Sequence, residues 1–216
     1  MLIVININQE DLINAFWFAV ASATQTYRRM VKSKGNNIFH IYRIFIGKIG
    51  ELTFLRWLSE EQKILSLNEL NNHIQQSLFI FWGEYNVDNY DIIIKNKKID
   101  VKTVPNDKYQ WLIVPIDQWE NQVKDYYVAI TTNIPKEIIT VVCNQLKICS
   151  SKEDIQDILN STIQDMQVIV KGYLPRGSPK WQKIESVDKY CPEKECVRAK
   201  LQGLESIDSL LVFLRK

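Results

Sequence analysis

Residues 90–103 read YDIIIKNKKIDVKT, in which two β-branched runs flank a polar Lys-Asn-Lys-Lys segment. Two such runs around a short polar segment predict a β-hairpin. Side chains alternate between the two faces of a strand. Asp91 and Ile93 are therefore expected on one face of the first strand, and Asp100 and Lys102 on one face of the second.

A two-residue turn at residues 96–97 would pair Ile93 with Asp100 and Asp91 with Lys102. The two aspartates then become diagonal neighbours on one face, about 7–8 Å apart at the backbone. Any turn with an even number of residues keeps this face relation, whereas an odd turn or a bulge would change it. The sequence therefore predicts that two carboxylates and one lysine converge on the hairpin.

Two carboxylates this close repel one another unless a positive group lies between them. Lys102 supplies one positive charge, and a divalent metal ion would supply two. Mg²⁺ commonly binds one or two carboxylates and completes its octahedron with water and phosphate oxygens. Such a metal lowers the pKa of a bound water, and a lysine can orient that water or stabilise developing charge. The pattern therefore suits metal-assisted phosphodiester hydrolysis; the alternative is a solvated hairpin with a surface ion pair.

A helix predicted over residues 38–60 carries a further candidate carboxylate. Glu51 shares a helical stripe with Leu55 and Leu58, which is an unusual place for an unpaired carboxylate. Gly47, one turn earlier, leaves room for another group to approach closely. The structural alternative is a glutamate at the edge of the apolar face.

Together these segments resemble the PD-(D/E)XK nuclease superfamily, whose pattern is a helix with Gly-Glu, a strand with Asp and a strand with (D/E)-x-K. The matching residues are Gly50-Glu51, Asp91 and Asp100-Val101-Lys102. The resemblance implies an α/β, restriction endonuclease-like fold, with a central mixed β-sheet flanked by helices. It also implies Mg²⁺ or Mn²⁺ bound by Asp91, Asp100 and the Val101 carbonyl. Glu51 would act on the metal directly or through water, and Lys102 would assist the nucleophilic water.

The match spans roughly residues 44–130 and departs from the commoner pattern in two places. Asp100 stands where glutamate is more frequent, which the pattern allows, and Tyr90 stands where proline often precedes the first aspartate. Some branches of the superfamily carry Q-x3-Y on the following helix, and residues 122–126 (QVKDY) have that spacing. A chance match of this short motif is the alternative.

A nuclease must hold a polyanion, so basic clusters should flank the site. Basic side chains would bind phosphates, and aromatic side chains could stack on bases. The candidate DNA-binding residues are Arg28, Arg29, Lys32, Lys48, Lys97, Lys98, Lys171, Arg176, Lys180 and Trp181. For the last of these, an anchor in the core is the alternative.

Hydrophobic periodicity predicts the remaining elements. Helices are expected over residues 9–33, 38–60, 115–124 and 151–161, with 61–76 helical or loop. Strands are expected over residues 2–7, 78–82, 90–95, 98–104, 111–115, 126–132, 137–143 and 166–174. We expect one nuclease domain over residues 1–216, with 1–37 as a helical N-terminal extension and 171–216 as a basic and aromatic loop plus a C-terminal segment.

The composition, 216 residues with 46% apolar residues and a net charge of +2, fits one domain with its own core. Because the net charge is small, a nucleic-acid site must arise from local clustering of basic residues. The four cysteines lack a good zinc-site spacing, and no secretory signal opens the chain. The apolar segment 12–23 is shorter than the about 20 residues that span a bilayer. We therefore expect a cytoplasmic protein without membrane association.

These features lead us to expect a Mg²⁺-dependent endodeoxyribonuclease, a hydrolase of phosphodiester bonds. A sequence-specific enzyme of type II restriction character is the leading expectation, as a homodimer whose twofold symmetry places one site on each DNA strand. A homing endonuclease, a junction resolvase and a mobile-element or CRISPR-linked nuclease of the same fold are alternatives. The non-enzyme alternative is a DNA-binding module with structural carboxylates.

Overall fold

The computed structural model describes residues 2–30, 37–78, 92–105, 109–145, 156–159, 166–184 and 195–215. The strands are β1 (Ile3–Asn6), β2 (Ile92–Ile94), β3 (Lys97–Val104), β4 (Trp111–Pro115), β5 (Tyr126–Thr132), β6 (Gln167–Pro175), β7 (Gln182–Ile184) and β8 (Cys196–Lys200). The helices are α1 (Gln9–Met30), α2 (Asn37–Glu60), α3 (Leu67–Ser77), α4 (Ile116–Asn121), α5 (Lys136–Gln145) and α7 (Ile207–Arg215).

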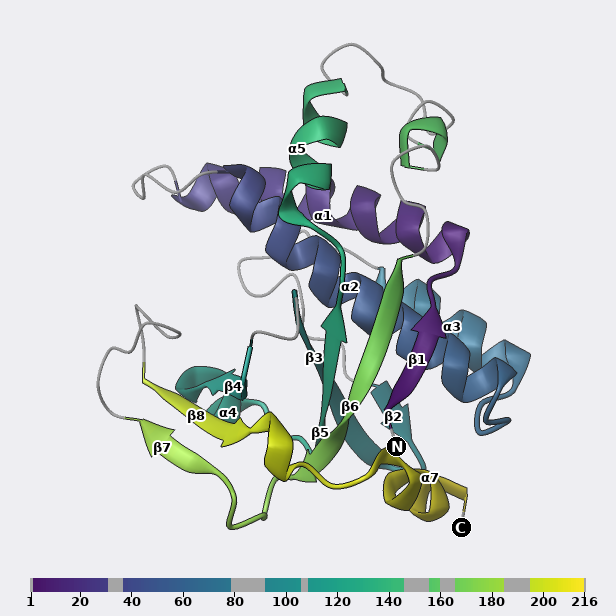
Figure 1. Cartoon of the computed structure of the whole chain (residues 1–216), viewed down its shortest axis with the longest axis vertical. Coiled ribbons are helices and arrows are strands. Elements are labelled where there is room, and N and C mark those ends of the chain that lie inside the picture. The colour runs from purple at the N-terminus through teal and green to yellow at the C-terminus, as the bar shows by residue number, and fades with distance from the viewer. Residues whose placement is uncertain are drawn as a thin grey trace.

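The described strands form two sheets (Figure 1). The larger sheet has five strands in the order β1-β6-β5-β3-β2, and only its β3–β5 pair is parallel. The smaller sheet is antiparallel, in the order β4-β8-β7. Figure 1 shows α2 crossing one side of the larger sheet, with α1 packed against α2. The expected class, an α/β fold with a mixed sheet flanked by helices, is confirmed at this level.

The central strands β3 and β5 separate two hydrophobic cores. Val128 of β5 joins the main core with α1 and α2, whereas Tyr127 and Ala129 join a second core with the small sheet. Asp100 pairs with Tyr127, and Lys102 pairs with Ala129, in the parallel β3–β5 ladder. Paired residues share a face of the sheet, so Asp100 and Lys102 lie on the face covered by the second core.

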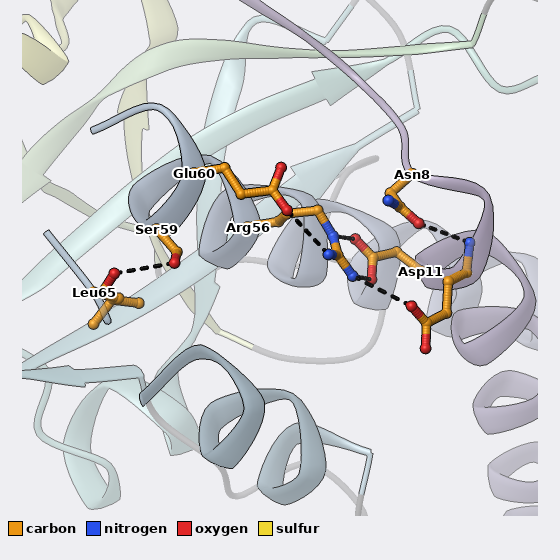
Figure 2. A network of polar contacts seen from close by, with 7 residues as sticks. Asn8, Asp11, Arg56, Ser59, Glu60 and Leu65 are labelled. Carbon is orange, nitrogen blue, oxygen red and sulfur yellow. Dashed lines mark hydrogen bonds and ion pairs between the residues drawn. The ribbon is translucent and has the colours of Figure 1, made fainter. Parts of the chain in front are cut away.

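Helices α1 and α2 are joined by a buried ion pair (Figure 2). Arg56 donates from Nε and Nη2 to the two carboxylate oxygens of Asp11, each at 2.7 Å. Asp11 is completely buried, and Arg56 also bonds the exposed Glu60 at 3.2 Å. Beyond this pair, Ser59 donates to the carbonyl of Leu65 at 3.0 Å and closes the turn that ends α2. These bonds fix the helix that carries Glu51.

The β2–β3 hairpin forms as predicted, but its turn lies one residue earlier, which shifts the strand pairing by two residues. The turn lies at Lys95 and Asn96, whose φ angles are +48° and +62°, as a two-residue type I′ turn requires. Ile93 therefore pairs with Lys98, and the predicted pairing of Ile93 with Asp100 is wrong. The turn still has an even number of residues, so the predicted face relation between Ile93 and Asp100 is confirmed.

The strand predicted over residues 137–143 is wrong, because this segment lies in helix α5. Ile138 and Ile139 are adjacent and both buried, whereas Val141 is 43% exposed. In a strand, Ile139 and Val141 would share one face, so this burial pattern does not fit a strand. Packing of α5 against α2 in the main core outweighs the β-propensity of the isoleucine and valine side chains.

The two ends of the described chain belong to the fold rather than to appendages. Strand β1 pairs with β6, and Phe16 of α1 is fully buried, so residues 2–30 of the predicted 1–37 extension pack within the fold. Within the predicted 171–216 loop and tail, β6 continues to Pro175, and β7, β8 and α7 follow. The predicted strand 78–82 and most of the predicted helix 151–161 lie outside the described residues. None of the described helices is long and apolar enough to cross a membrane.

Replacing Gly50 by alanine is expected to destabilise the protein, because α2 meets β3 at this glycine. A Cβ at Gly50 would collide with Thr103 Oγ1 and lie 3.0 Å from Thr103 Cγ2. The matched control is Gly47→Ala, since a Cβ at Gly47 meets no atom within 4 Å. Both variants gain the same helix propensity, so Gly50→Ala should be less stable than Gly47→Ala by about 1–3 kcal/mol. Urea unfolding measures this difference, and equal stabilities would contradict the close contact.

Candidate active site

A pocket of about 70 Å³ lies between α2, the β2–β3 hairpin and α4. Its lining residues are Gly47, Glu51, Ile92, Ile99, Asp100, Val101, Lys102, Gln118, Gln122 and Lys124. The structure thus brings together four of the predicted site residues from two separate segments: Glu51 from α2, and Asp100, Val101 and Lys102 from β3. The volume leaves room for several water molecules.

The close contact between α2 and β3 places Glu51 at this pocket. Gly50 allows α2 to approach β3 at Thr103, and Glu51 follows Gly50 directly. On the hairpin side, Ile92 of β2 pairs with Ile99 of β3, and Asp100 follows Ile99 directly. The pocket therefore lies where the helix and the hairpin meet at β3.

Asp100 and Lys102 form one ion pair within the pocket. Lys102 Nζ lies 2.9 Å from Asp100 Oδ2, and it donates to Gln118 Oε1 of α4 at 3.0 Å. The Lys102 and Asp100 side chains are 25% and 17% exposed. The shared face predicted from strand alternation is thus confirmed, and both side chains remain accessible to a small ligand.

Glu51 is held by Lys48, which lies three residues earlier on α2. Lys48 Nζ lies 2.7 Å from Glu51 Oε2 and 3.1 Å from Ser77 Oγ of α3, and it lies 4.5 Å from the centre of the Phe18 ring of α1. Lys48 is only 2% exposed. The structure does not support the predicted contact of Lys48 with a DNA phosphate, because the Lys48 ammonium is buried and bonded to Glu51.

Tyr127 of β5 is the strand partner of Asp100 and lies in the second core. Burial, and then the negative charge of Asp100, raise the pKa of Tyr127 to about 12. Its hydroxyl is buried and has no hydrogen-bond partner among the residues that the structure describes. Tyr127 stacks on Trp119 of α4 at a centroid distance of 5.4 Å. This packing supports α4 and thereby the position of Gln118.

Several predicted site residues lie outside the part of the chain whose side chains the structure describes. Asp91 and Lys32 are outside the described residues, and of Arg28 and Arg29 only the backbone, near the end of α1, is described. Their roles in metal or DNA binding stay predictions.

The basic residues of the hairpin tip differ in their surroundings. Lys97 Nζ lies 3.4 Å from Asp125 Oδ1, and both side chains are 38% exposed. Lys98 is exposed, and its backbone nitrogen donates to Asp125 Oδ2 at 2.9 Å. Lys98 is therefore the more available of the two predicted lysines for contact with a phosphate.

The predicted DNA-binding residues after β5 are spread over a strand, a turn and the second core. Trp181 donates from Nε1 to the Pro175 carbonyl at 2.9 Å, and its ring contacts Trp119 at 5.0 Å, so it is an anchor in the core. Arg176 lies over the same Trp119 ring at 4.7 Å. Lys171 is half-buried in β6, and Lys180 is exposed in the turn before β7.

Gln118 and Lys124 line the pocket but were not predicted from the sequence. Lys124 is 6% exposed, and no local pattern marks it as a pocket residue. Gln122 of the Q-x3-Y motif also lines the pocket, but Tyr126 is the first residue of β5, so the motif does not lie on one helix.

A second basic surface, which was not predicted from the sequence, lies on the small sheet. Trp111 of β4 pairs with Lys200 of β8, and Arg198 lies two residues away on the same face. The Arg198 guanidinium is 4.2 Å, and the Lys200 ammonium 5.7 Å, from the centre of the Trp111 ring. These residues are far apart in sequence, so only the strand pairing assembles this basic and aromatic surface.

Two other features, a hollow at the start of α1 and the histidine of α3, offer fewer groups that could bind a ligand. A larger hollow of about 390 Å³ lies at the start of α1, but its lining includes one carboxylate, Glu10, and no cation. His73 of α3 is half-buried, and burial lowers the pKa of its imidazole. Within the described part of the chain, no group of three or more His, Cys, Asp or Glu side chains could hold a metal ion.

The arrangement at the pocket combines two carboxylates with lysines that compensate their charge. Carboxylate oxygens are the ligands that Mg²⁺ and Mn²⁺ prefer. Glu51 and Asp100 are therefore the described carboxylates of this pocket that could hold a hard divalent cation, with the Lys102 ammonium beside Asp100. No protein-family model matches the chain, and comparisons with curated proteins and with solved structures found no match either.

Proposed function

We propose that this protein is a Mg²⁺-dependent DNA endonuclease of the PD-(D/E)XK type, most similar in function to type II restriction enzymes. The observation that carries the proposal is the meeting of Glu51 with Asp100 and Lys102 at one pocket. These residues are about 50 positions apart in the sequence, and they match the helix glutamate and the D-x-K strand of that superfamily.

The residues of the pocket fit a divalent metal ion. Glu51 and Asp100 supply carboxylate oxygens, and Val101 supplies a backbone carbonyl at the same edge. Asp91 would complete the set: it directly precedes Ile92, the partner of Ile99, and Asp100 directly follows Ile99. When bound, Mg²⁺ would lower the pKa of a water ligand and offset the charge of the phosphate.

The protein side chains would then position the reactants. Lys102, held by Asp100 and Gln118, would donate to the attacking water or to a non-bridging phosphate oxygen. The water oxygen forms a bond to phosphorus, the bond to the leaving sugar oxygen breaks, and that oxygen takes up a proton. Lys124, which is 6% exposed, also lines the pocket and adds a positive charge to it.

Three exposed or half-exposed basic groups could hold DNA. Lys98 lies on the hairpin that carries Asp100, and Arg176 lies against α4, the helix of Gln118. The Trp111 surface of the small sheet, defined above with Arg198 and Lys200, offers cations beside an aromatic ring. Such groups suit phosphate contacts with adjacent base stacking.

The proposal is tested by incubating the purified protein with supercoiled plasmid, linear duplex, single strands and four-way junctions. We expect cleavage in Mg²⁺ or Mn²⁺ and none in EDTA, because the carboxylates need the metal to act on a phosphodiester. Discrete products from duplex DNA would support a restriction-like enzyme, and selective nicking of junctions would instead support a resolvase. DNA binding without metal-dependent cleavage of any substrate would favour a binding module and refute the proposal.

A further inference from the structure

Lys48 is the most deeply buried lysine among the described residues, with an exposed fraction of 2%. Three elements surround its ammonium. It bonds Glu51 at 2.7 Å within α2 and Ser77 of α3 at 3.1 Å, and the Phe18 ring of α1 lies 4.5 Å away. Ser77 is also 2% exposed. A lysine in this position is fixed by the fold, unlike a lysine on the surface.

Stability alone does not account for a buried lysine at this place. Removing a lysine and a carboxylate from water is expensive, and replacing a buried ion pair by apolar side chains is often neutral or stabilising. A methionine would fill the same space between Phe18 and Ser77 without the charge. The partner of the ion pair, Glu51, is 12% exposed and lines the pocket that also contains Asp100.

We propose that Lys48 and Ser77 are positioning residues that hold the Glu51 carboxylate in the orientation in which it binds the divalent metal. This inference rests on the proposed function. Lys48 engages Oε2 of Glu51, and Ser77 fixes the ammonium from the next helix. The Glu51 carboxylate is therefore oriented at the pocket before a metal ion binds. Partners that hydrogen-bond metal ligands in this way typically change metal affinity by about 10–100-fold when they are removed.

A simple effect of charge predicts the opposite sign. If Lys48 acted on the metal only through its positive charge, its removal would relieve repulsion and tighten metal binding. If it orients Glu51, its removal frees the carboxylate and weakens metal binding. The direction of the change therefore distinguishes the two roles.

The experiment measures Mn²⁺ binding to the full-length, metal-free protein by calorimetry or by the paramagnetic resonance of free Mn²⁺. We expect Lys48→Met to weaken Mn²⁺ binding about 10–100-fold and to raise, by a similar factor, the Mg²⁺ concentration at which DNA cleavage is half-maximal. The matched control is Lys63→Met, which removes one exposed lysine after α2 and should leave both values unchanged. Circular dichroism confirms that each variant is folded.

A double-mutant cycle shows whether Lys48 acts through Glu51. Glu51→Gln removes the ligand, so adding Lys48→Met should then change Mn²⁺ binding little further. Additive effects of the two substitutions would overturn the positioning role, as would Mn²⁺ binding by Lys48→Met that is unchanged or tighter. If Lys48→Met does not fold, Ser77→Ala provides the test, with a smaller loss of Mn²⁺ affinity expected and an unchanged affinity refuting the proposal.

The outcomes separate this inference from the proposed function. A wild-type protein that binds no Mn²⁺ and cleaves no DNA would refute the nuclease and, with it, the role of Lys48. A wild-type protein that binds Mn²⁺ and cleaves DNA, together with an unaffected Lys48→Met variant, would refute only the role of Lys48.

Discussion

Replacing Asp100 by asparagine is expected to lower the rate constant of metal-dependent DNA cleavage about 1000-fold. Asparagine keeps the shape of the side chain and an oxygen that can accept from Lys102, but it removes the negative charge that binds Mg²⁺. Asp100 is 17% exposed and its partner Lys102 is 25% exposed, and the asparagine oxygen can still accept from Lys102, so we expect a change in stability of about 1 kcal/mol. Affinity for DNA should be retained or increased, because one negative charge leaves the pocket.

Single-turnover cleavage in Mg²⁺ measures the rate, and gel shifts in EDTA measure DNA binding. Asp125→Asn is the matched control, since this aspartate also contacts a lysine, Lys97 at 3.4 Å, but does not line the pocket. We expect its cleavage rate to stay within a few-fold of wild type. A rate for Asp100→Asn close to that of wild type would show that Asp100 does not bind the metal.

Replacing Arg56 by methionine is expected to destabilise the fold by about 3–5 kcal/mol, because it leaves a buried charge without its partner. Asp11 is completely buried, and both of its carboxylate oxygens accept from Arg56 at 2.7 Å (Figure 2). The hydrogen bond to Asp11 raises the pKa of the Arg56 guanidinium above its ordinary value. For a chain of this size the loss corresponds to a decrease in melting temperature of about 6–20 °C.

Thermal and urea unfolding followed by circular dichroism measure this effect. Glu60→Gln is the control, because Glu60 is 56% exposed and its contact with Arg56 lies at the surface, so a change below about 0.5 kcal/mol is expected. Combining Arg56→Met with Asp11→Leu should recover much of the lost stability, since the buried charge is then removed as well. An Arg56→Met variant as stable as wild type would contradict the role of the pair in joining α1 to α2.

Local periodicity was sufficient to predict much of the fold and the arrangement of Asp100 and Lys102. Side chains alternate along a strand, so Asp100 and Lys102 had to share a face wherever β3 paired. Because the turn has an even number of residues, Ile93 of β2 lies on the same face as Asp100. The stripe that contains Glu51 followed in the same way from the 3.6-residue repeat of a helix. These features depend on backbone geometry alone.

Long-range packing decided the remaining features, because they depend on residues that are distant in the sequence. Residues 137–143 are helical, and α5 packs against α2. Lys48 looked like a surface lysine in the sequence, yet Ser77, 29 residues away, and Phe18 enclose it. The i, i+3 spacing of Lys48 and Glu51 is compatible with this ion pair. The packing of α1 and α3 around α2 determines that Lys48 is buried. Sequence periodicity thus gave the face on which each candidate group lies, and only the tertiary contacts decided which of these groups share a pocket.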